Sequence, residues 1–424
     1  MRIMSRRQRG NSSLGISDQL KTFGGLTFFK DYRAVPNPTV TADYSVGSPV
    51  ATFTYSVTAS ARTYVDGSGV IMDANVVNTP RFQGGYYDAT GFHAQKGLMI
   101  ERASTNLAQD SYFLDGTNTY WHLASDPTVT AKSTDYVNPY GGGTVIKIVT
   151  PSNVHGIYSN AATITDATKY TVSALVRGTG TIVLYFDKAA TTTSSSFTLS
   201  PTEWRLFQHT FTSNSALAAA VGVLSGAAAD LTCYVAAIQM EALPYATSFI
   251  PTTTAAVTRN AESLSYVSAS NRTEAQESIF IKFAAISVFA NDTKTRTLLY
   301  DPEASAGTRL IYKGDNATKP TFYPNSESGD AGVTASTTVP AANTSYVVAM
   351  TANSANVNPN NTVYVNGASE GSSNTNWTSK AFATSFQIGH TATSDQLDGI
   401  IQSIAIFSDV KDQAAVTAIT QAMQ

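Results

Sequence analysis

Paired carboxylates are the first residues to look for, because hydrolysis of a glycosidic bond needs one carboxyl group as nucleophile or base and another as general acid. No Glu-x-Asp-x-x-Glu or similar cluster occurs in the sequence. The strand-like segment GIIQSIAIF, residues 399–407, carries no charge. Glu303 and Glu327 lie in separate turn-like segments, and neither has a second glutamate beside it. The sequence therefore predicts a protein that is not an enzyme.

The histidines are too widely spaced to form a local metal-binding pair of the kind that neighbouring positions on one element provide. They are His93, His122, His155, His209 and His390. No phosphate-binding P-loop occurs either. Tyr86, Tyr87 and His93 lie in a glycine-rich turn region, where a single histidine is more often a solvated loop residue than a catalyst. We therefore expect no cofactor at these residues.

Recognition of a sugar needs an aromatic face for the pyranose ring and polar groups for its hydroxyls, and three tryptophans could supply the face. Trp204, in the alternating segment EWRLFQHTF, is predicted to lie in a core. Trp121, in NTYWHLASD, is a candidate glycan-binding residue, although it could equally mark the first strand of a sandwich. Trp377, in the Ser/Asn-rich loop SSNTNWTSKAF, is the second candidate, and it could instead cover the core.

Composition and charge exclude several classes of protein. The chain has 424 residues, of which 42% are hydrophobic and only 13% charged, and its net charge is −3. Such a chain has no general attraction for nucleic acid or for an anionic membrane. Its single cysteine, Cys233, is expected in the core and allows no intrachain disulfide. We expect neither a secretory signal nor membrane insertion, since the longest apolar run is far below the roughly 20 residues of a spanning helix.

The first 40 residues are predicted to form an extended anchoring arm. Basic residues crowd its first ten positions, and without interleaved aromatic residues they favour docking onto an acidic protein surface over binding nucleic acid. The aromatic residues further along could dock on another subunit or pack on the chain's own first domain. The anchoring candidates are Arg2, Arg6, Arg7, Arg9, Phe28 and Phe29.

The remaining residues read as short strands with period-two alternation, separated by Gly, Ser and Asn turns. We predict an all-β fold with two antiparallel β-sandwiches of jelly-roll type, preceded by the extended N-terminal arm. The expected divisions are an arm at 1–40, a small β/loop connector at 41–105, a jelly roll at 106–250, a linker at 251–265 and a sandwich at 266–424. The last 15 or so residues have helical period, with Val416, Ile419 and Met423 on one face and Asp409 or Asp412 as the N-cap.

Three stretches of the sequence resemble known families. Residues 59–107, ASARTYVDGSGVI…TPRF…GLMIERASTNL, resemble a segment found in many phage structural and tail proteins. The run KYTVSALVRG…EWRLFQHTFT…CYVAAIQMEALPYATSFIPT resembles a carbohydrate-binding jelly roll of phage fibres and secreted glycosidases. The run TVYVNG…SFQIGH…LDGIIQSIAIFSDVKDQAAVTAI resembles the laminin-G or concanavalin-like lectin fold. Together the resemblances cover residues 59–424.

These resemblances imply a bacteriophage virion protein, namely a head or tail fibre, a spike or a decoration on the particle exterior. It would be assembled in the cytoplasm of the bacterial host, attach to capsid, portal or tail proteins through its arm, and display its sandwiches for adsorption to a glycan of the host surface. Such proteins are usually homo-oligomers, and we expect a trimer. The alternatives are a capsule-degrading glycosidase or depolymerase, with carboxylates brought together from distant loops, and a purely architectural decoration without a ligand.

The lectin resemblance also raises the question of calcium, which lectin-type sandwiches often bind through a loop carboxylate and backbone carbonyls. Asp395 and Asp398, in TSDQLDG, resemble that position by location only. Asp-Gly is also an ordinary turn signal. The two aspartates are therefore metal candidates, with a simple turn as the alternative.

Overall fold

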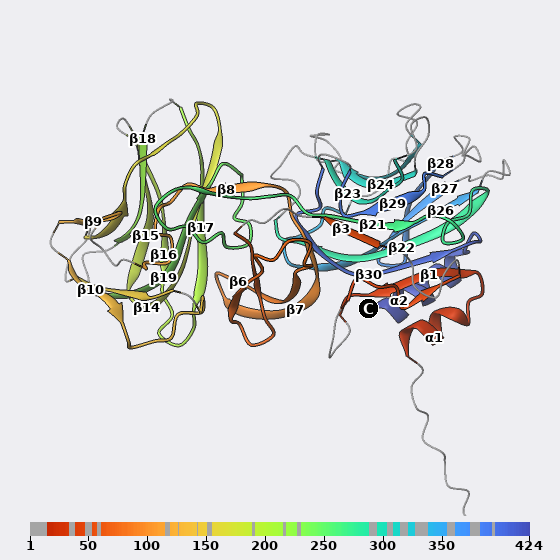
Figure 1. Cartoon of the computed structure of the whole chain (residues 1–424), viewed down its shortest axis with the longest axis horizontal. Coiled ribbons are helices and arrows are strands. Elements are labelled where there is room, and N and C mark those ends of the chain that lie inside the picture. The colour runs from red at the N-terminus through yellow and green to blue at the C-terminus, as the bar shows by residue number, and fades with distance from the viewer. Residues whose placement is uncertain are drawn as a thin grey trace, which may run out of the picture.

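Two β-sandwiches lie side by side, with a small β-rich connector between them (Figure 1). The computed structural model describes residues 15–33, 39–46, 53–56, 61–114, 119–125, 127–141, 143–150, 155–188, 191–214, 218–226, 230–287, 295–302, 308–313, 321–326, 338–353, 361–373, 382–391 and 395–424. Its named strands pair antiparallel, which confirms the predicted all-β fold class.

The first sandwich packs a five-stranded sheet against a six-stranded sheet. In spatial order, the five strands are β10 (Thr128–Ser133), β11 (Val145–Thr150), β19 (Leu231–Glu241), β14 (Lys169–Thr179) and β17 (Arg205–Thr212). The six are β16 (Thr191–Thr198), β15 (Thr181–Lys188), β18 (Ala218–Ser225), β12 (Gly156–Ser159) and β9 (Trp121–Ala124), with β13 (Ala162–Thr163) paired to β18. In β17, Phe207 and Phe211 point into the core while Gln208 and Thr210 point outward, as the alternation predicts.

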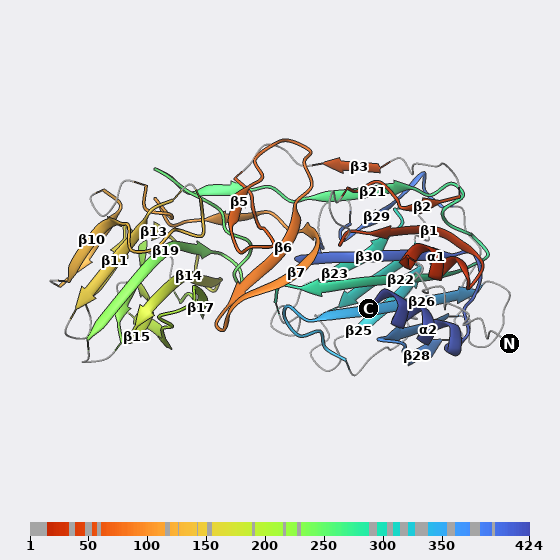
Figure 2. The ribbon, with the colours of Figure 1, turned by 90° about the horizontal axis from the view of Figure 1, so that it is seen from below.

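The larger sheet of the second sandwich has nine strands drawn from both ends of the chain. In order, they are β2 (Tyr44–Ser45), β1 (Leu26–Asp31), β30 (Gly399–Phe407), β22 (Gln276–Ala285), β26 (Ser345–Asn353), β27 (Asn361–Val365) and β28 (Ala368–Ser373). The hairpin strands β7 (Gly91–Ile100) and β6 (Phe82–Asp88) extend this sheet, because β7 pairs with β30. Figure 2 shows β7 and β30 running together at the junction between the sandwiches.

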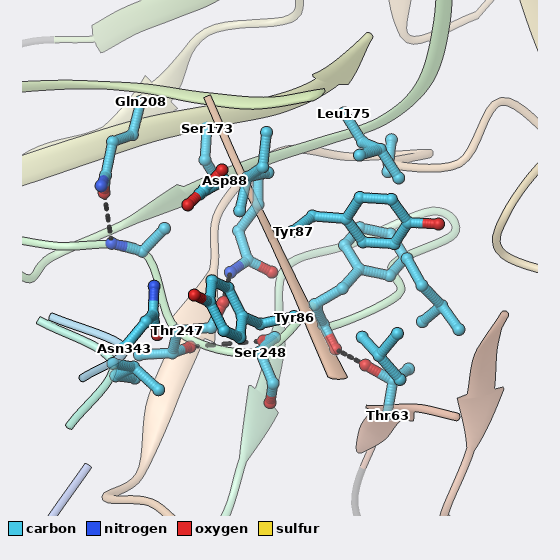
Figure 3. A pocket seen from close by; sticks show the side chains of 18 of the residues that line it. Thr63, Tyr86, Tyr87, Asp88, Ser173, Leu175, Gln208, Thr247, Ser248 and Asn343 are labelled. Atoms are coloured by element: carbon cyan, nitrogen blue, oxygen red, sulfur yellow. Dashed lines mark hydrogen bonds between the residues drawn. The ribbon is translucent and has the colours of Figure 1, made fainter. Parts of the chain in front are cut away.

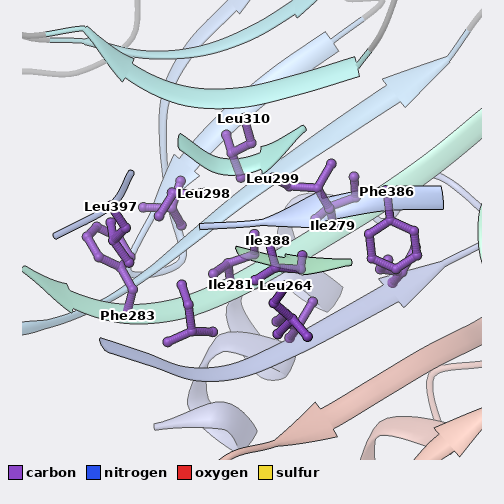
Figure 4. Packing of buried hydrophobic residues seen from close by; sticks show 14 of the residues in the cluster. Leu264, Ile279, Ile281, Phe283, Leu298, Leu299, Leu310, Phe386, Ile388 and Leu397 are labelled. Carbon is purple, nitrogen blue, oxygen red and sulfur yellow. The ribbon is translucent and has the colours of Figure 1, made fainter. Parts of the chain in front are cut away.

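The opposing sheet has six strands, and the main core lies between the two sheets. In order, its strands are β25 (Thr321–Ser326), β24 (Thr308–Lys313), β23 (Thr295–Tyr300), β29 (Ser385–Ile388), β21 (Ser263–Val267) and β3 (Phe53–Ser56). Figure 4 shows Ile279, Ile281 and Phe283 of β22 facing Leu264, Leu298 and Phe386 of the opposing sheet, and all six side chains are fully buried. Burial of this apolar surface is the main force holding the second sandwich together.

Two helices cover the outer face of the nine-stranded sheet. They are α1 (Ile16–Lys21) and α2 (Gln413–Met423). The predicted C-terminal helix is confirmed, since Asp412 caps it by accepting a hydrogen bond from the Ala415 N–H, and the buried face carries Val416, Ile419 and Met423. No helix among the described residues is long and apolar enough to cross a membrane.

The prediction of an extended arm is wrong for residues 16–31 and 44–45, which are built into the second sandwich. Phe28 of β1 pairs with Ile406 of β30 and points into the main core, while Phe29 pairs with Ala405 and packs under the helices. A strand buried on both faces has no surface left for docking. Arg2, Arg6, Arg7 and Arg9 lie outside the described residues, so their anchoring role stays a prediction.

The connector differs from the predicted domain divisions because some of its strands belong to the sheets of the second sandwich. The predicted hairpin turn at Asp66–Gly69 does join two strands, β4 (Thr63–Val65) and β5 (Ile71–Asp73). Its strand β3, however, belongs to the second sandwich, where it pairs with β21. The predicted linker at 251–265 contains β20 (Val257–Arg259), which pairs with β8 (Ser104–Asn106), and the start of β21.

Candidate functional site

A cleft of about 420 Å³ lies where the two sandwiches and the connector meet (Figure 3). Strands β14, β17 and β19 of the first sandwich form one wall, the connector forms another, and β22 and β30 of the second sandwich contribute the rest. The volume falls within the roughly 300–1,000 Å³ range of small-molecule sites. Junctions between domains are frequent locations for such sites, so this cleft is the candidate functional site.

A half-buried tyrosine ring from the connector lines the cleft. Tyr86 on β6 stacks on its cross-strand partner His93 on β7, with ring centroids 5.1 Å apart and planes 25° from parallel. Asp88 and Thr90 hold the histidine ring, at 3.0 and 2.8 Å from its Nε2. The pKa of Tyr86 is raised by burial and by the nearby Asp88, so its hydroxyl stays protonated and can donate. The arrangement presents a fixed aromatic surface with a polar tip.

Two adjacent glycines allow this hairpin to form. A Cβ at Gly84 would lie 2.4 Å from the backbone nitrogen of Gly67, and a Cβ at Gly85 would lie 2.3 Å from the ring of Phe92. Neither collision can be relieved without moving the β4–β5 turn or the aromatic ring. The glycine-rich sequence before Tyr86 is therefore required by close packing.

Several hydrogen-bonding groups surround the tyrosine, and some have capacity to spare. The side-chain oxygen of Gln208 accepts from the Ala246 N–H at 3.1 Å, and its amide N–H groups make no hydrogen bond within the described part of the chain. Gln95 donates to the Asn343 carbonyl at 2.8 Å, which leaves its own side-chain oxygen available. The Ser173 hydroxyl likewise has no hydrogen-bonding partner among the described residues. These groups could bind ligand hydroxyls.

The second sandwich contributes an apolar floor to the cleft. Met99, Ala284 and Ile400 are at most 3% exposed and pack together, and half-buried Ile286 lies against them. A cleft with a polar wall and an apolar floor suits an amphipathic ligand.

A buried ion network lies beneath the cleft and ties the connector to residues 259–262, which lie between the two sandwiches in the chain. Glu262 receives hydrogen bonds from Arg62, at 3.2 Å, and from two nitrogens of Arg81. Arg81 also reaches Glu101, at 2.7 Å, and Glu101 lies 3.3 Å from Arg259. All five side chains are fully buried. Because burying an unpaired charge is very costly, these residues stabilise one arrangement of the junction only while all are present.

The network makes an acid-stability prediction at Glu101. Burial would raise its pKa, but Arg259, Arg81 and two hydrogen bonds from Ser248 outweigh this and lower it to about 2. The stabilisation therefore exists above the unfolded pKa and is lost as the pH falls from about 4.5 towards 2. We therefore expect the difference in the free energy of unfolding between wild type and Glu101→Gln to become smaller over that pH range. Urea unfolding at several pH values measures this difference. A difference that does not depend on pH would contradict an ionised Glu101 in the folded protein. Comparing the two proteins cancels the contribution of Glu241, whose pKa burial raises.

The second predicted metal candidate is the centre of another ion cluster and not a calcium ligand. The fully buried Asp398 is bonded through its side chain to Arg102 and Arg296 and accepts from the Tyr245 hydroxyl at 2.7 Å. Two cations therefore occupy the place of a metal ion. Asp395 has a left-handed backbone (φ 59°), and its carbonyl accepts a hydrogen bond from the Thr297 N–H of β23. No cluster of metal-binding side chains occurs among the described residues.

The structure also corrects the first glycan-binding candidate. Trp121 is only 1% exposed, packs against Phe113 and donates its indole N–H to the Asp110 carbonyl. It therefore marks the first strand of the sandwich, which was the alternative interpretation, and offers no face to a sugar. Trp204, predicted to be core, is half-buried on the outer face of the five-stranded sheet beside Tyr136. Trp377 lies outside the described residues and stays a prediction.

The residues of the cleft were not singled out as a binding site by the sequence. The glycine-rich segment before Tyr86 was the only signal. The other contributors, such as Gln208 and Asn343, lie far apart in the chain and meet only through the fold. Residues 367–371, GASEG, match G-x-S-x-G, the pattern of a nucleophilic serine on a turn from a strand into a helix. Here the segment runs from a turn into β28, so the match does not indicate a catalytic serine.

Comparison with known proteins supports the lectin resemblance of the second sandwich. Residues 284–417 match the family model described as the concanavalin A-like lectin/glucanases superfamily. No curated protein sequence matches the chain.

Similar solved structures include the sialidase of Trypanosoma rangeli in complex with the inhibitor DANA, at 14% identity and a TM-score of 0.29, with 37% of this chain and 26% of that chain covered. Domain 4 of AbnA, an extracellular arabinanase from Geobacillus stearothermophilus, in complex with arabinotriose, has 15% identity and a TM-score of 0.31, with 38% of this chain and 73% of that chain covered. TmCBM61 in complex with β-1,4-galactotriose has 15% identity and a TM-score of 0.26, with 32% and 97% covered. Over residues 284–417, the second sandwich is therefore similar to the laminin-G and concanavalin-like lectin domains.

Proposed function

We propose that this chain is a non-enzymatic glycan-binding protein of a bacteriophage particle, and that its glycan lies in the cleft between the sandwiches. The observation that carries the binding function is the Tyr86 ring, held by His93 at the edge of a cleft that also contains spare hydrogen-bonding groups. An aromatic face stacks on the apolar face of a pyranose, while amides and hydroxyls bind its hydroxyl groups.

The charges of the cleft support binding over hydrolysis. Asp88 is the only carboxylate among the described residues that line it. Glycoside hydrolysis by the usual route needs two carboxyl groups across the scissile bond. Three buried glutamates lie behind the lining residues. Glu101 and Glu262 are engaged by arginines, and Glu241 accepts hydrogen bonds from Gln239 and Thr247.

Replacing Tyr86 by alanine is expected to weaken glycan binding by about tenfold or more, as truncation of a central aromatic anchor typically does. The wild type is first tested against a panel of neutral, N-acetylated, deoxy and acidic oligosaccharides. Titration calorimetry with each oligosaccharide that binds then compares the affinities of wild type and variant.

The matched control is Tyr158→Ala. Tyr158 on β12 is also a half-buried tyrosine paired with a cross-strand histidine, His122, at 5.3 Å, but it lies outside the cleft. Its strand pairs with β9, at the end of the first sandwich away from the connector (Figure 1). Equal losses in both variants, or binding to no member of the panel, would overturn the proposed site.

The phage setting is supported by the resemblance of residues 59–107 to phage structural proteins. On a particle, many copies would strengthen adsorption of a weakly binding site to the host surface, and a homotrimer would present three clefts together. Quantitative mass spectrometry of purified phage particles tests this setting by counting copies per major capsid subunit. Hundreds of copies per particle would indicate a head decoration, and a few tens or fewer would indicate a tail fibre or spike. Absence from the particle would contradict the virion role.

A further inference from the structure

We infer that the cleft selects uncharged glycans whose rings carry a methyl group, either in an N-acetyl substituent or at the end of a deoxy sugar. This inference rests on the proposed glycan-binding function and names the ligand class of the same cleft. It depends on two features, the charges that line the cleft and the composition of its floor.

The charges disfavour acidic sugars. The described lining residues include Asp88 but no lysine, arginine or histidine. Hydrogen bonds from Thr90 and His93 outweigh burial and lower the pKa of Asp88, so it is a carboxylate at neutral pH. Arg81 and Arg259, beneath the cleft, are fully buried and bonded to glutamates. A sugar carboxylate or sulfate would lose its water, gain no cation and face a like charge.

The floor favours a methyl group over a hydroxyl. Met99, Ala284, Ile286 and Ile400 pack together into one apolar surface. A hydroxyl pressed against it would lose its hydrogen bonds with water without replacement. A methyl group would be buried favourably, and a single methyl or methylene in such a pocket changes affinity by roughly tenfold or more. The polar wall across the cleft then remains available for the ring hydroxyls.

The test compares matched sugars in titrations with the full chain. Chitotriose and cellotriose share a β-linked glucan backbone and differ only in an N-acetyl group against a hydroxyl. L-Fucose and L-galactose differ only in a methyl group against a hydroxymethyl group. N-Acetyllactosamine and its sialylated form differ in one acidic sugar. We expect the methyl-bearing member of at least one of the first two pairs to bind about tenfold or more tightly, and the sialylated form to bind more weakly than its neutral parent.

Two variants assign these preferences to the cleft. Ile286→Ser removes part of the floor at a half-buried position. In this variant we expect the ratio of affinities between the two sugars of the responding pair to fall towards one. Tyr86→Ala is expected to weaken the binding of both sugars. Binding that depends on Tyr86 but is equal within both pairs, or is stronger for the sialylated form, would overturn this inference and leave the glycan-binding function standing. If none of these sugars and no member of the wider panel binds, both this inference and the proposed glycan-binding function are overturned.

Discussion

Glu262→Gln is expected to lower the free energy of unfolding by about 3–5 kcal/mol, because it leaves the buried Arg62 without its charge partner and Arg81 with Glu101 alone. Arg62 and Arg81 both donate to Glu262, and all three side chains are fully buried. A neutral glutamine has nearly the same shape, so the loss comes from electrostatics and hydrogen bonding and not from a cavity. Urea unfolding at neutral pH measures the change.

The matched control is Glu203→Gln at an exposed pair. The Glu203 side chain is 53% exposed and lies 3.7 Å from Arg205, and such surface pairs contribute about 0–1 kcal/mol. If both variants change the stability equally, the buried network does not stabilise the junction. We also expect Glu262→Gln to weaken glycan binding, since Arg81 donates to Thr63 and Ser248, which both line the cleft.

Trp121→Ala is expected to destabilise the first sandwich by about 3–5 kcal/mol, the usual cost of removing a large aromatic side chain from a packed core. The indole is 1% exposed and packs against Phe113, with a ring-centroid distance of 5.1 Å. Its hydrogen bond to the Asp110 carbonyl would be lost as well. Thermal or urea unfolding gives the stability, and titration below the unfolding transition gives the sugar affinity, which should stay near that of wild type.

Trp204→Ala serves as the comparison. Because Trp204 is only half-buried, its replacement should lower the free energy of unfolding by less than that of Trp121 does. The opposite pattern would be a small loss of stability at Trp121 together with loss of sugar binding. That result would return Trp121 to the role of a glycan-binding residue.

Local patterns in the sequence were enough to predict many individual elements. The C-terminal helix follows from its helical period and from Asp412, which caps it as predicted. Strand β17 follows from alternation around Phe207 and Phe211, and the β4–β5 hairpin from the turn residues Asp66–Gly69. In each case the signal and the structure it specifies lie within about a dozen residues.

Pairing between distant segments could not be predicted in the same way. The arm was predicted because residues 16–31 have little periodicity of their own, and their partner strand β30 lies at the other end of the chain. A strand buried on both faces, as Phe28 and Phe29 show, loses the alternation that marks a half-exposed strand. The same limit hid the network, in which Arg81 and Glu262 are 181 residues apart.

The site was hidden for a related reason. Its side chains come from short stretches of many strands, and each stretch is unremarkable alone. Tryptophan was the obvious residue type to search for, whereas the aromatic face of the cleft is a tyrosine fixed by a cross-strand histidine. Asp398, the second aspartate of TSDQLDG, was a metal candidate from its position in the sequence alone. The fold places Arg102 and Arg296 against its carboxylate.

The most direct test of the central claim is a crystal structure of the full chain with the oligosaccharide that binds it most tightly in the panel. We expect a sugar ring stacked on Tyr86, with hydroxyls bonded to Gln208 or Asn343 and a methyl group on the floor formed by Met99 and Ile400. A sugar bound only outside this cleft, for example at Tyr158, would contradict the assignment of the site.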